Sequence, residues 1–235
     1  MGVVLKGNIL RVDMFGGTLM NHFKFVIMCG GIYRQWQKPR QLLEINGEPI
    51  VARTIRLLRE NGITDISISS NLPDFDKFGV PVLVHDNSYD TKGYNDHTGQ
   101  WADAFYPCEE PVCYLFGDVV FSPEAIKKII ETETDSIEFF ASAPPFDPRY
   151  VKEWAEPFAL KVVDNAKLKC AVEDTRLLDF DGFFARKPIM WELWQVIKRT
   201  PLNIIDYTNY TVINDWTCDV DSPDDIEMIA RYVNG

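Results

Sequence analysis

Residues 23–31 read FKFVIMCGG, and residues 32–50 continue as IYRQWQKPRQLLEINGEPI. A short apolar run that stops at two glycines predicts a buried strand and a tight turn, because glycine lets the backbone approach another group closely. The loop after the turn carries Arg34, Lys38 and Arg40 and no acidic residue. Backbone N–H groups and nearby cations together favour an anionic ligand. The stretch therefore predicts a phosphate-binding turn at the carboxyl end of a strand.

Neither of the two standard phosphate-binding motifs is present in this stretch. No Gly-Lys-Ser or Gly-Lys-Thr closes the loop, and the pattern Gly-x-Gly-x-x-Gly is missing. For Gly30 and Gly31 taken alone, a plain turn followed by a solvated basic loop is the simpler interpretation. The order of the features favours phosphate binding, because the turn, the cations and the start of a helix follow one another directly. Arg56 and Arg59 on that helix are assigned to a solvated face.

The composition is that of an acidic protein with one hydrophobic core. The chain has 235 residues, of which 46% are hydrophobic, enough for a single α/β core. The net charge of −11 argues against a nucleic-acid-binding surface and makes the basic loop stand out. Five scattered cysteines without a Cys-x-x-Cys pair favour reduced thiols in a cytoplasmic protein without structural zinc.

The chain is expected to consist of an amino-terminal extension, residues 1–22, and one domain, residues 23–235. The extension lacks the continuous apolar segment of a secretion signal. No stretch approaches the length of a membrane span, so no membrane partner is expected.

The order of the predicted elements indicates an α/β protein. A helix should begin at Glu48-Pro49 and end at Gly62, and others should cover residues 123–133 and 187–199 and begin at Ser222-Pro223. The amphipathic stripe of the helix at 187–199 should face the core or a homodimer interface. Strands are expected at 63–70, 80–84, 112–116, 137–142 and 158–163. This rhythm predicts a Rossmann-like, three-layer α/β/α domain with a mixed, mostly parallel sheet, in which ligands bind at the carboxyl ends of the strands.

Acidic residues follow two of these segments in a way that helix capping does not explain. Asp118 comes directly after the apolar run 112–116, and Ser122 already serves as the N-cap of the next helix. Asp219 and Asp221 alternate along an extended segment, so both side chains should point the same way. We therefore expect these three carboxylates to face the ligand crevice.

Three other segments leave their roles open. Residues 88–100 are polar and contain glycine, which suggests an active-site loop. Tyr150, Lys152, Trp154 and Glu156 suit an acceptor pocket and a rim of the core equally well. Lys161 either reaches a substrate phosphate or, as is commoner for a lysine in a strand, faces solvent.

The three motifs together resemble the nucleotidyltransferases with the nucleotide-diphospho-sugar transferase (GT-A-like) fold. That family includes sugar-1-phosphate nucleotidyltransferases, methylerythritol phosphate cytidylyltransferase and molybdopterin guanylyltransferase. It opens with Gly-Gly-x-Gly-x-Arg and Pro-Lys-x-Leu, has Gly-Asp-x-x-Phe in mid-chain, and closes with Asp-Ile-Asp-Thr-Pro-Glu-Asp-Leu. This chain departs from the opening at Tyr33, which replaces the third glycine, at Gln35, which replaces the arginine, and at Arg40, which replaces the lysine.

The resemblance implies a Mg²⁺-dependent enzyme that joins an NTP to a small phosphorylated acceptor and releases pyrophosphate. It implies a metal site made by Asp118 with Asp219 or Asp221. The implied nucleotide-binding residues are Cys29, Gly30, Gly31, Arg34, Lys38 and Arg40. Of these, Arg34, Lys38 and Arg40 are expected, with Asp118, to act in catalysis.

Two alternatives remain open from the sequence. The first is a glycosyltransferase of the same fold, although that class usually carries Asp-x-Asp after its central strand and this chain has a single aspartate in Gly117-Asp118-Val119. The second is a nucleotide-binding protein without catalytic activity, in line with the altered glycine loop. The base of the NTP and the identity of the acceptor also stay open.

Overall fold

A computed structural model describes residues 22–30, 38–85, 102–143, 155–205 and 207–233 of the chain. The predicted extension lies outside these residues except for His22. Gly31, Arg34, the loop at 88–100, and Tyr150, Lys152 and Trp154 also lie outside them.

A seven-stranded sheet forms the centre of the molecule, in the order β10-β8-β9-β6-β1-β4-β5. The strands are β1 (Lys24–Met28), β4 (Ile66–Ser70), β5 (Val82–Val84), β6 (Val112–Phe116), β8 (Ile137–Ser142), β9 (Pro157–Val162) and β10 (Thr211–Ile213). Every strand runs in the same direction except β9, which is antiparallel to both of its neighbours. The prediction of a mixed, mostly parallel sheet is therefore confirmed.

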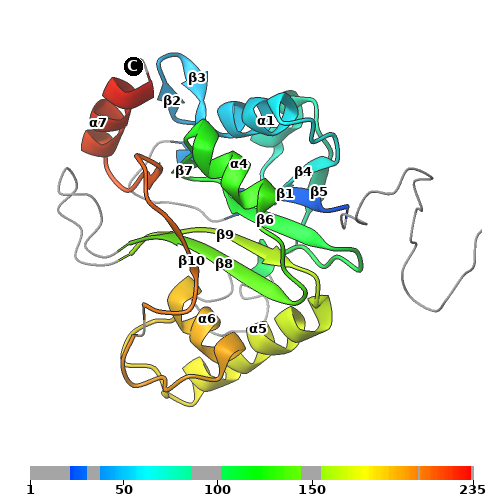
Figure 1. Cartoon of the computed structure of the whole chain (residues 1–235), viewed down its shortest axis with the longest axis vertical. Coiled ribbons are helices and arrows are strands. Elements are labelled where there is room, and N and C mark those ends of the chain that lie inside the picture. The colour runs from blue at the N-terminus through cyan, green and yellow to red at the C-terminus, as the bar shows by residue number, and fades with distance from the viewer. Residues whose placement is uncertain (1–21, 31–37, 86–101, 144–154, 206, 234–235) are drawn as a thin grey trace, which may run out of the picture.

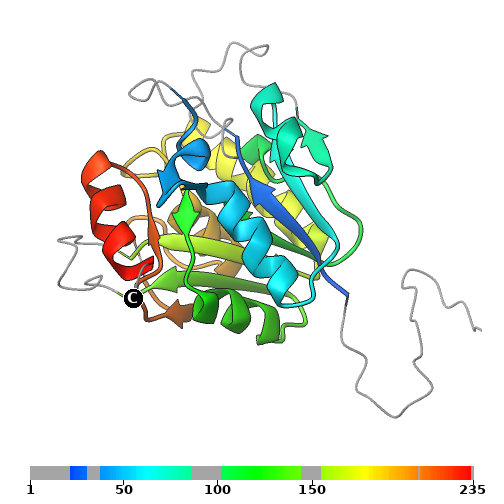
Figure 2. The same ribbon diagram turned by 90° about the horizontal axis from the view of Figure 1, so that it is seen from above.

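Helices cover both faces of this sheet, as the three-layer prediction required (Figure 1). One face carries α1 (Ile50–Glu60), α4 (Pro123–Glu131) and α7 (Pro223–Val233), and the other carries α5 (Asn165–Phe180) and α6 (Met190–Lys198). Seen from above, α1 lies across the strands and α7 lies at one side of the sheet (Figure 2). Side chains alternate between the two faces of a strand, so Phe25 and Val26 of β1 belong to different core clusters.

Short elements connect the layers near the ends of β1 and β6. The 3₁₀ turn η1 (Arg40–Leu42) is followed by a hairpin of β2 (Glu44–Ile45) and β3 (Glu48–Pro49), and the 3₁₀ turn η2 (Pro73–Phe78) follows β4. Asn46 and Gly47 have φ values of 53° and 81°, the sign that a type I′ hairpin turn requires. The predicted helix start at Glu48-Pro49 is thus a hairpin strand, and α1 begins directly after it.

Most predicted helix boundaries agree with the structure within a few residues. Gly62, with φ of 79°, follows the end of α1. Ser122 Oγ accepts a hydrogen bond of 2.9 Å from the Ala125 N–H at the start of α4. Trp191, Leu193 and Trp194 of α6 are buried, so this stripe belongs to the core. No helix was predicted for residues 165–180, where α5 lies.

Lys161 has neither of its two predicted roles. Its side chain is buried, and Nζ donates to the carbonyl oxygens of Ile129, Ile130 and Thr132 at 3.1, 2.9 and 2.6 Å. These carbonyls end α4, where no further N–H of the helix reaches them. Lys161 Nζ also lies 4.4 Å from the centroid of the Phe23 ring. Lys161 therefore caps the carboxyl end of α4.

Within the described part of the chain, no helix combines the length and the apolar character needed to cross a membrane.

Candidate active site

The carboxyl ends of β1, β4 and β6 are held together at one edge of the sheet. The Gly117 N–H donates to the Met28 carbonyl at 3.0 Å, and the Cys29 N–H donates to the Ser69 carbonyl at 2.8 Å. Ser70 Oγ donates to the Cys29 carbonyl at 3.0 Å. A Cβ on Gly117 would lie 2.4 Å from the Met28 carbonyl oxygen and 2.8 Å from Cys29 Sγ, so only glycine fits at this position.

Gly30, the first glycine of the predicted phosphate-binding turn, packs against two side chains. A Cβ at Gly30 would lie 3.0 Å from Ala104 Cβ and 3.1 Å from His85 Nε2. Both of these residues are buried. The sequence predicted that another group would approach this glycine closely. In the structure the groups that do so are the side chains of Ala104 and His85.

A two-stranded antiparallel ladder joins the two acidic motifs. The strand β7 (Val119–Val120) pairs with β11 (Cys218–Asp219), and Val119 lies opposite Asp219. The Val220 N–H donates to the Asp118 carbonyl at 3.0 Å. The structure thus brings Asp118, Asp219 and Asp221 to one place, beside the end of β6.

Arg40 lies between these acids and binds two of them. Its Nη2 is 2.8 Å from Asp118 Oδ2, and its Nη1 is 2.5 Å from Asp221 Oδ1. Nη1 also donates to the Val220 carbonyl at 2.8 Å. The side chain is largely buried, because η1 packs against the core through Leu42. The cation that the sequence assigned to the triphosphate is thus paired with two of the candidate metal ligands.

Glu156 joins the same group of acids. One carboxylate oxygen from each of Glu156, Asp219 and Asp221 lies within 4.8 Å of the others. Two hydrogen bonds fix the backbone of Glu156: its N–H donates to Ser142 Oγ at 2.8 Å, and its carbonyl accepts from the Ser142 N–H at 3.0 Å. Glu156 reaches this edge because β9 is reversed, which places the start of β9 beside the ends of the parallel strands. Glu156 therefore lies beside the candidate metal ligands, and both roles proposed for it, in an acceptor pocket or at a rim of the core, stay predictions.

The carboxylates of Glu156, Asp219 and Asp221 lie close enough together to suit a hard divalent cation. Asp118 is not one of these three, although Arg40 links it to Asp221. Oxygen donors of this type are the ligands that Mg²⁺ and Ca²⁺ prefer, and Asp118, Asp219, Asp221 and Glu156 supply only oxygen. The residues present therefore fit the predicted metal.

The neighbouring thiol is held in its protonated form. Burial raises the pKa of Cys29 well above its ordinary value, and the charge of Asp118 raises it further. Cys29 Sγ is therefore a poor nucleophile. Lys38, another predicted nucleotide contact, is exposed.

Three buried polar atoms near this edge were missed by the sequence analysis. Gln41 Oε1, Ser69 Oγ and Asn71 Oδ1 are buried and have no hydrogen-bond partner among the described residues. Ser69 is the second-last residue of β4, and Asn71 is the first residue after this strand. Both therefore lie at the carboxyl end of a parallel strand, where such sheets bind ligands. A buried strand that ends in consecutive polar residues, ISISSN, is the signal that would have identified them.

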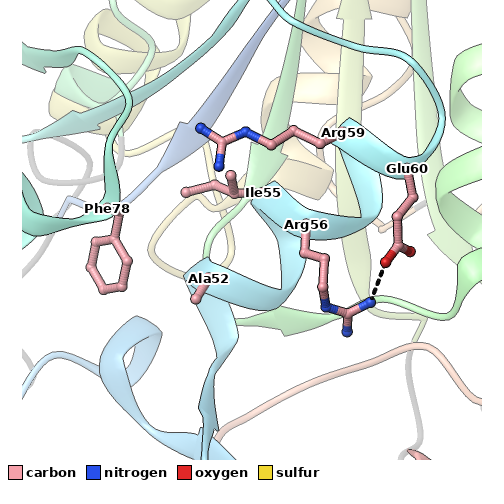
Figure 3. A pocket seen from close by; sticks show the side chains of 6 residues that line it. All are labelled: Ala52, Ile55, Arg56, Arg59, Glu60 and Phe78. Carbon is pink, nitrogen blue, oxygen red and sulfur yellow. Dashed lines mark hydrogen bonds and ion pairs between the residues drawn. The ribbon is translucent and has the colours of Figure 1, made fainter.

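A separate pocket lies on the outer side of α1 (Figure 3). It is lined by Ala52, Ile55, Arg56, Arg59, Glu60 and Phe78. Arg56 binds Glu60 at 2.9 Å and Glu48 at 2.8 Å. The solvated-face assignment of Arg56 and Arg59 agrees with this location, since neither contributes to the group of acids around Arg40.

Comparisons with known proteins agree with this architecture. Residues 25–171 match the model of the MobA-like NTP transferase domain. A solved CTP:phosphocholine cytidylyltransferase from Streptococcus pneumoniae is 16% identical, with 90% of this chain and 99% of that chain aligned and a TM-score of 0.51. A protein from Bacillus anthracis assigned as a glucose-1-phosphate thymidylyltransferase is 16% identical, with 90% and 94% aligned and a TM-score of 0.48. No curated protein matches the chain.

Proposed function

The chain belongs to the family of MobA-like NTP transferase domains and is a nucleotidyltransferase, and on this premise we propose that it is a Mg²⁺-dependent enzyme that joins an NTP to a phosphorylated acceptor. The acceptor is a sugar phosphate or a small alcohol phosphate. One of its phosphate oxygens attacks the α-phosphorus of the NTP. The bond from the α-phosphorus to the bridging oxygen breaks, and pyrophosphate leaves.

The observation that carries this proposal is the convergence of Asp118, Asp219 and Asp221 with Arg40 at the carboxyl ends of β1 and β6. Phosphoryl and nucleotidyl transfer need positioning and charge neutralisation more than covalent help from the protein. When bound by Asp118 and by Asp219 or Asp221, Mg²⁺ supplies neutralisation of phosphate charge. This role for the metal is the reason the carboxylates must lie together.

The chain's own residues bind and orient the nucleotide. The N–H groups of Gly30 and Gly31 are proposed to donate to phosphate oxygens. Cys29, whose own N–H is bonded to the Ser69 carbonyl, is proposed to line the nucleotide site at the end of β1. Arg34, Lys38 and Arg40 are proposed to hold the triphosphate, and their positive charge stabilises the negative charge that gathers on the leaving pyrophosphate.

One protein of similar fold supports the proposed acceptor class, and the family match supports the reaction. The Streptococcus protein with this fold is described as a phosphocholine cytidylyltransferase, an enzyme with an alcohol phosphate acceptor. The family match favours a nucleotidyltransferase over a glycosyltransferase and over a binding protein without activity. The single aspartate of the Gly117-Asp118-Val119 segment points the same way.

A substrate screen tests the proposal. The full chain is incubated with each of the four NTPs and a panel of phosphorylated sugars and alcohols, and pyrophosphate release is measured with Mg²⁺ and with a chelator. We expect release for one NTP and one acceptor class, and none with the chelator or with Asp118→Asn. Pyrophosphate release that is unaffected by both treatments would contradict the proposed mechanism.

A further inference from the structure

Arg40 occupies the space between the candidate metal ligands. One guanidinium contacts Asp118 Oδ2 through Nη2, and contacts Asp221 Oδ1 and the Val220 carbonyl through Nη1. These partners come from the turn before β7 and from the segment after β11. A cation that binds both Asp118 and Asp221 must lie in this same gap.

A guanidinium and a divalent cation cannot both bind these carboxylates in the observed arrangement without strong repulsion. Like charges a few ångströms apart in a partly buried site repel far more than they do in water. The side chains of Arg40 and Asp118 are 10% and 19% exposed, so water screens this pair weakly, whereas the side chain of Asp221 is 51% exposed. A metal bound between Asp118 and Asp221 therefore requires the Arg40 guanidinium to leave at least one of these two carboxylates.

We propose that Arg40 is a resident counter-cation, which holds Asp118 and Asp221 together in the nucleotide-free protein and is exchanged for the metal when the nucleotide arrives. The part of this proposal that concerns nucleotide rests on the proposed function. The triphosphate offers Arg40 new oxygen partners, and the metal that enters with it takes over the carboxylates. Free metal therefore binds weakly, whereas the metal–nucleotide complex binds well.

The proposal accounts for the arginine in the Pro39-Arg40-Gln41 segment, where the resembling family has lysine. An arginine presents separate nitrogens in a planar fork and can bridge two carboxylates at once, whereas a lysine presents a single nitrogen. Nη1 and Nη2 of Arg40 use this geometry on different acids. A lysine would carry the same single positive charge but would place it on one nitrogen, so it would contact the two acids less closely and leave the metal site more open.

Binding of Mn²⁺ alone tests the exchange. The full chain without nucleotide is titrated with Mn²⁺, and free metal is measured by electron paramagnetic resonance. We expect weak binding to the wild type and roughly tenfold tighter binding to Arg40→Gln, a difference of about 1.4 kcal/mol. The tighter binding should be lost again in Arg40→Gln/Asp118→Asn. Arg56→Gln serves as the matched control, because Arg56 also bridges two carboxylates but lies on the outer side of α1, and it should bind Mn²⁺ like the wild type.

Equal or weaker Mn²⁺ binding by folded Arg40→Gln would overturn the proposal, because Arg40 would then help to organise the site for the metal. Arg40→Lys covers the case in which Arg40→Gln does not fold: it should bind Mn²⁺ more tightly than the wild type, and binding no tighter than the wild type would also overturn the proposal. The pyrophosphate assay on the wild type is a separate test. If it fails for every NTP, the proposed function is wrong, while the Mn²⁺ result still decides whether Arg40 blocks the metal site.

Discussion

Replacement of Lys161 by methionine should destabilise the protein without changing its chemistry. The substitution keeps the apolar stem and removes the ammonium that binds three carbonyl oxygens at the end of α4, at 2.6 to 3.1 Å. A carbonyl left buried without a partner costs about 1–3 kcal/mol, so three carbonyls set an upper range of roughly 3–9 kcal/mol. Methionine also avoids burying an ammonium, which costs several kcal/mol, and burial lowers the pKa of Lys161 for the same reason.

The net effect should be a loss of about 2–3 kcal/mol in the free energy of unfolding. For a domain of this size that corresponds to roughly 4–12 °C in Tm. Urea denaturation of the wild type and of Lys161→Met measures it directly. Lys127→Met is the matched control, since Lys127 belongs to α4, the helix that Lys161 caps. Its side chain is 64% exposed, and its Nζ lies 3.8 Å from Glu131 Oε1. The control should change stability by less than about 0.5 kcal/mol.

Pyrophosphate release per folded molecule should be the same in Lys161→Met and the wild type. Unchanged stability would refute the capping role inferred from the three hydrogen bonds. Normal stability with lost turnover would instead restore the alternative in which Lys161 contacts a substrate phosphate.

Four further outcomes follow from the contacts around the site. Asp118→Asn should lower turnover by roughly a hundredfold or more, because it removes a charge from the proposed metal site, and pyrophosphate release measures this. Asp225→Asn should lower turnover much less but lower stability by about 1 kcal/mol in urea, because Asp225 Oδ2 accepts from two backbone N–H groups at the start of α7, at 2.9 and 2.7 Å. Gly117→Ala should destabilise the protein by more than about 2 kcal/mol, since the added Cβ would lie 2.4 Å from a backbone oxygen; an equally stable variant would refute the packing described. Hydrogen bonds from Arg56 lower the pKa of Glu48 from 4.5, so the stability advantage of the wild type over Glu48→Gln should be present above that pH and disappear as the pH falls through the lowered pKa.

Much of the fold could be predicted because local patterns report local structure. The cap at Ser122, the glycine after α1 and the apolar run of β6 each have a signature of a few residues. The reversed direction of β9 has none, since a strand pattern reads the same in both directions. The α5 helix was missed because its buried stripe is narrow, with only Leu168, Ala171 and Thr175 buried.

The candidate site was predictable to the level of backbone placement. The sequence predicted that Asp118 would lie near the two later aspartates because each acid was expected to end a strand at one edge of the sheet. In the structure an antiparallel ladder outside that sheet, β7 with β11, brings them together. The choice of partners by long side chains was not predictable. Arg40 can reach either phosphate or carboxylate, and Lys161 can lie on either side of a strand until the helix that covers it is known. Glu156 was placed beside the site by the strand reversal, which the sequence does not signal.

The pairing of β7 with β11 has a consequence for the order of events during folding. Val119 and Asp219 are joined across about a hundred residues of chain, and closing so long a loop costs entropy before any contact compensates for it. Other pairs of the central sheet close much shorter loops and can form earlier, because Phe25 of β1 pairs with Ile66 of β4 and Ile68 of β4 pairs with Val82 of β5. During synthesis on the ribosome, a chain that has not yet reached residue 221 can form most of its sheet but has no complete acidic site. The protein therefore acquires its capacity to hold metal late, after the scaffold that positions it has already formed.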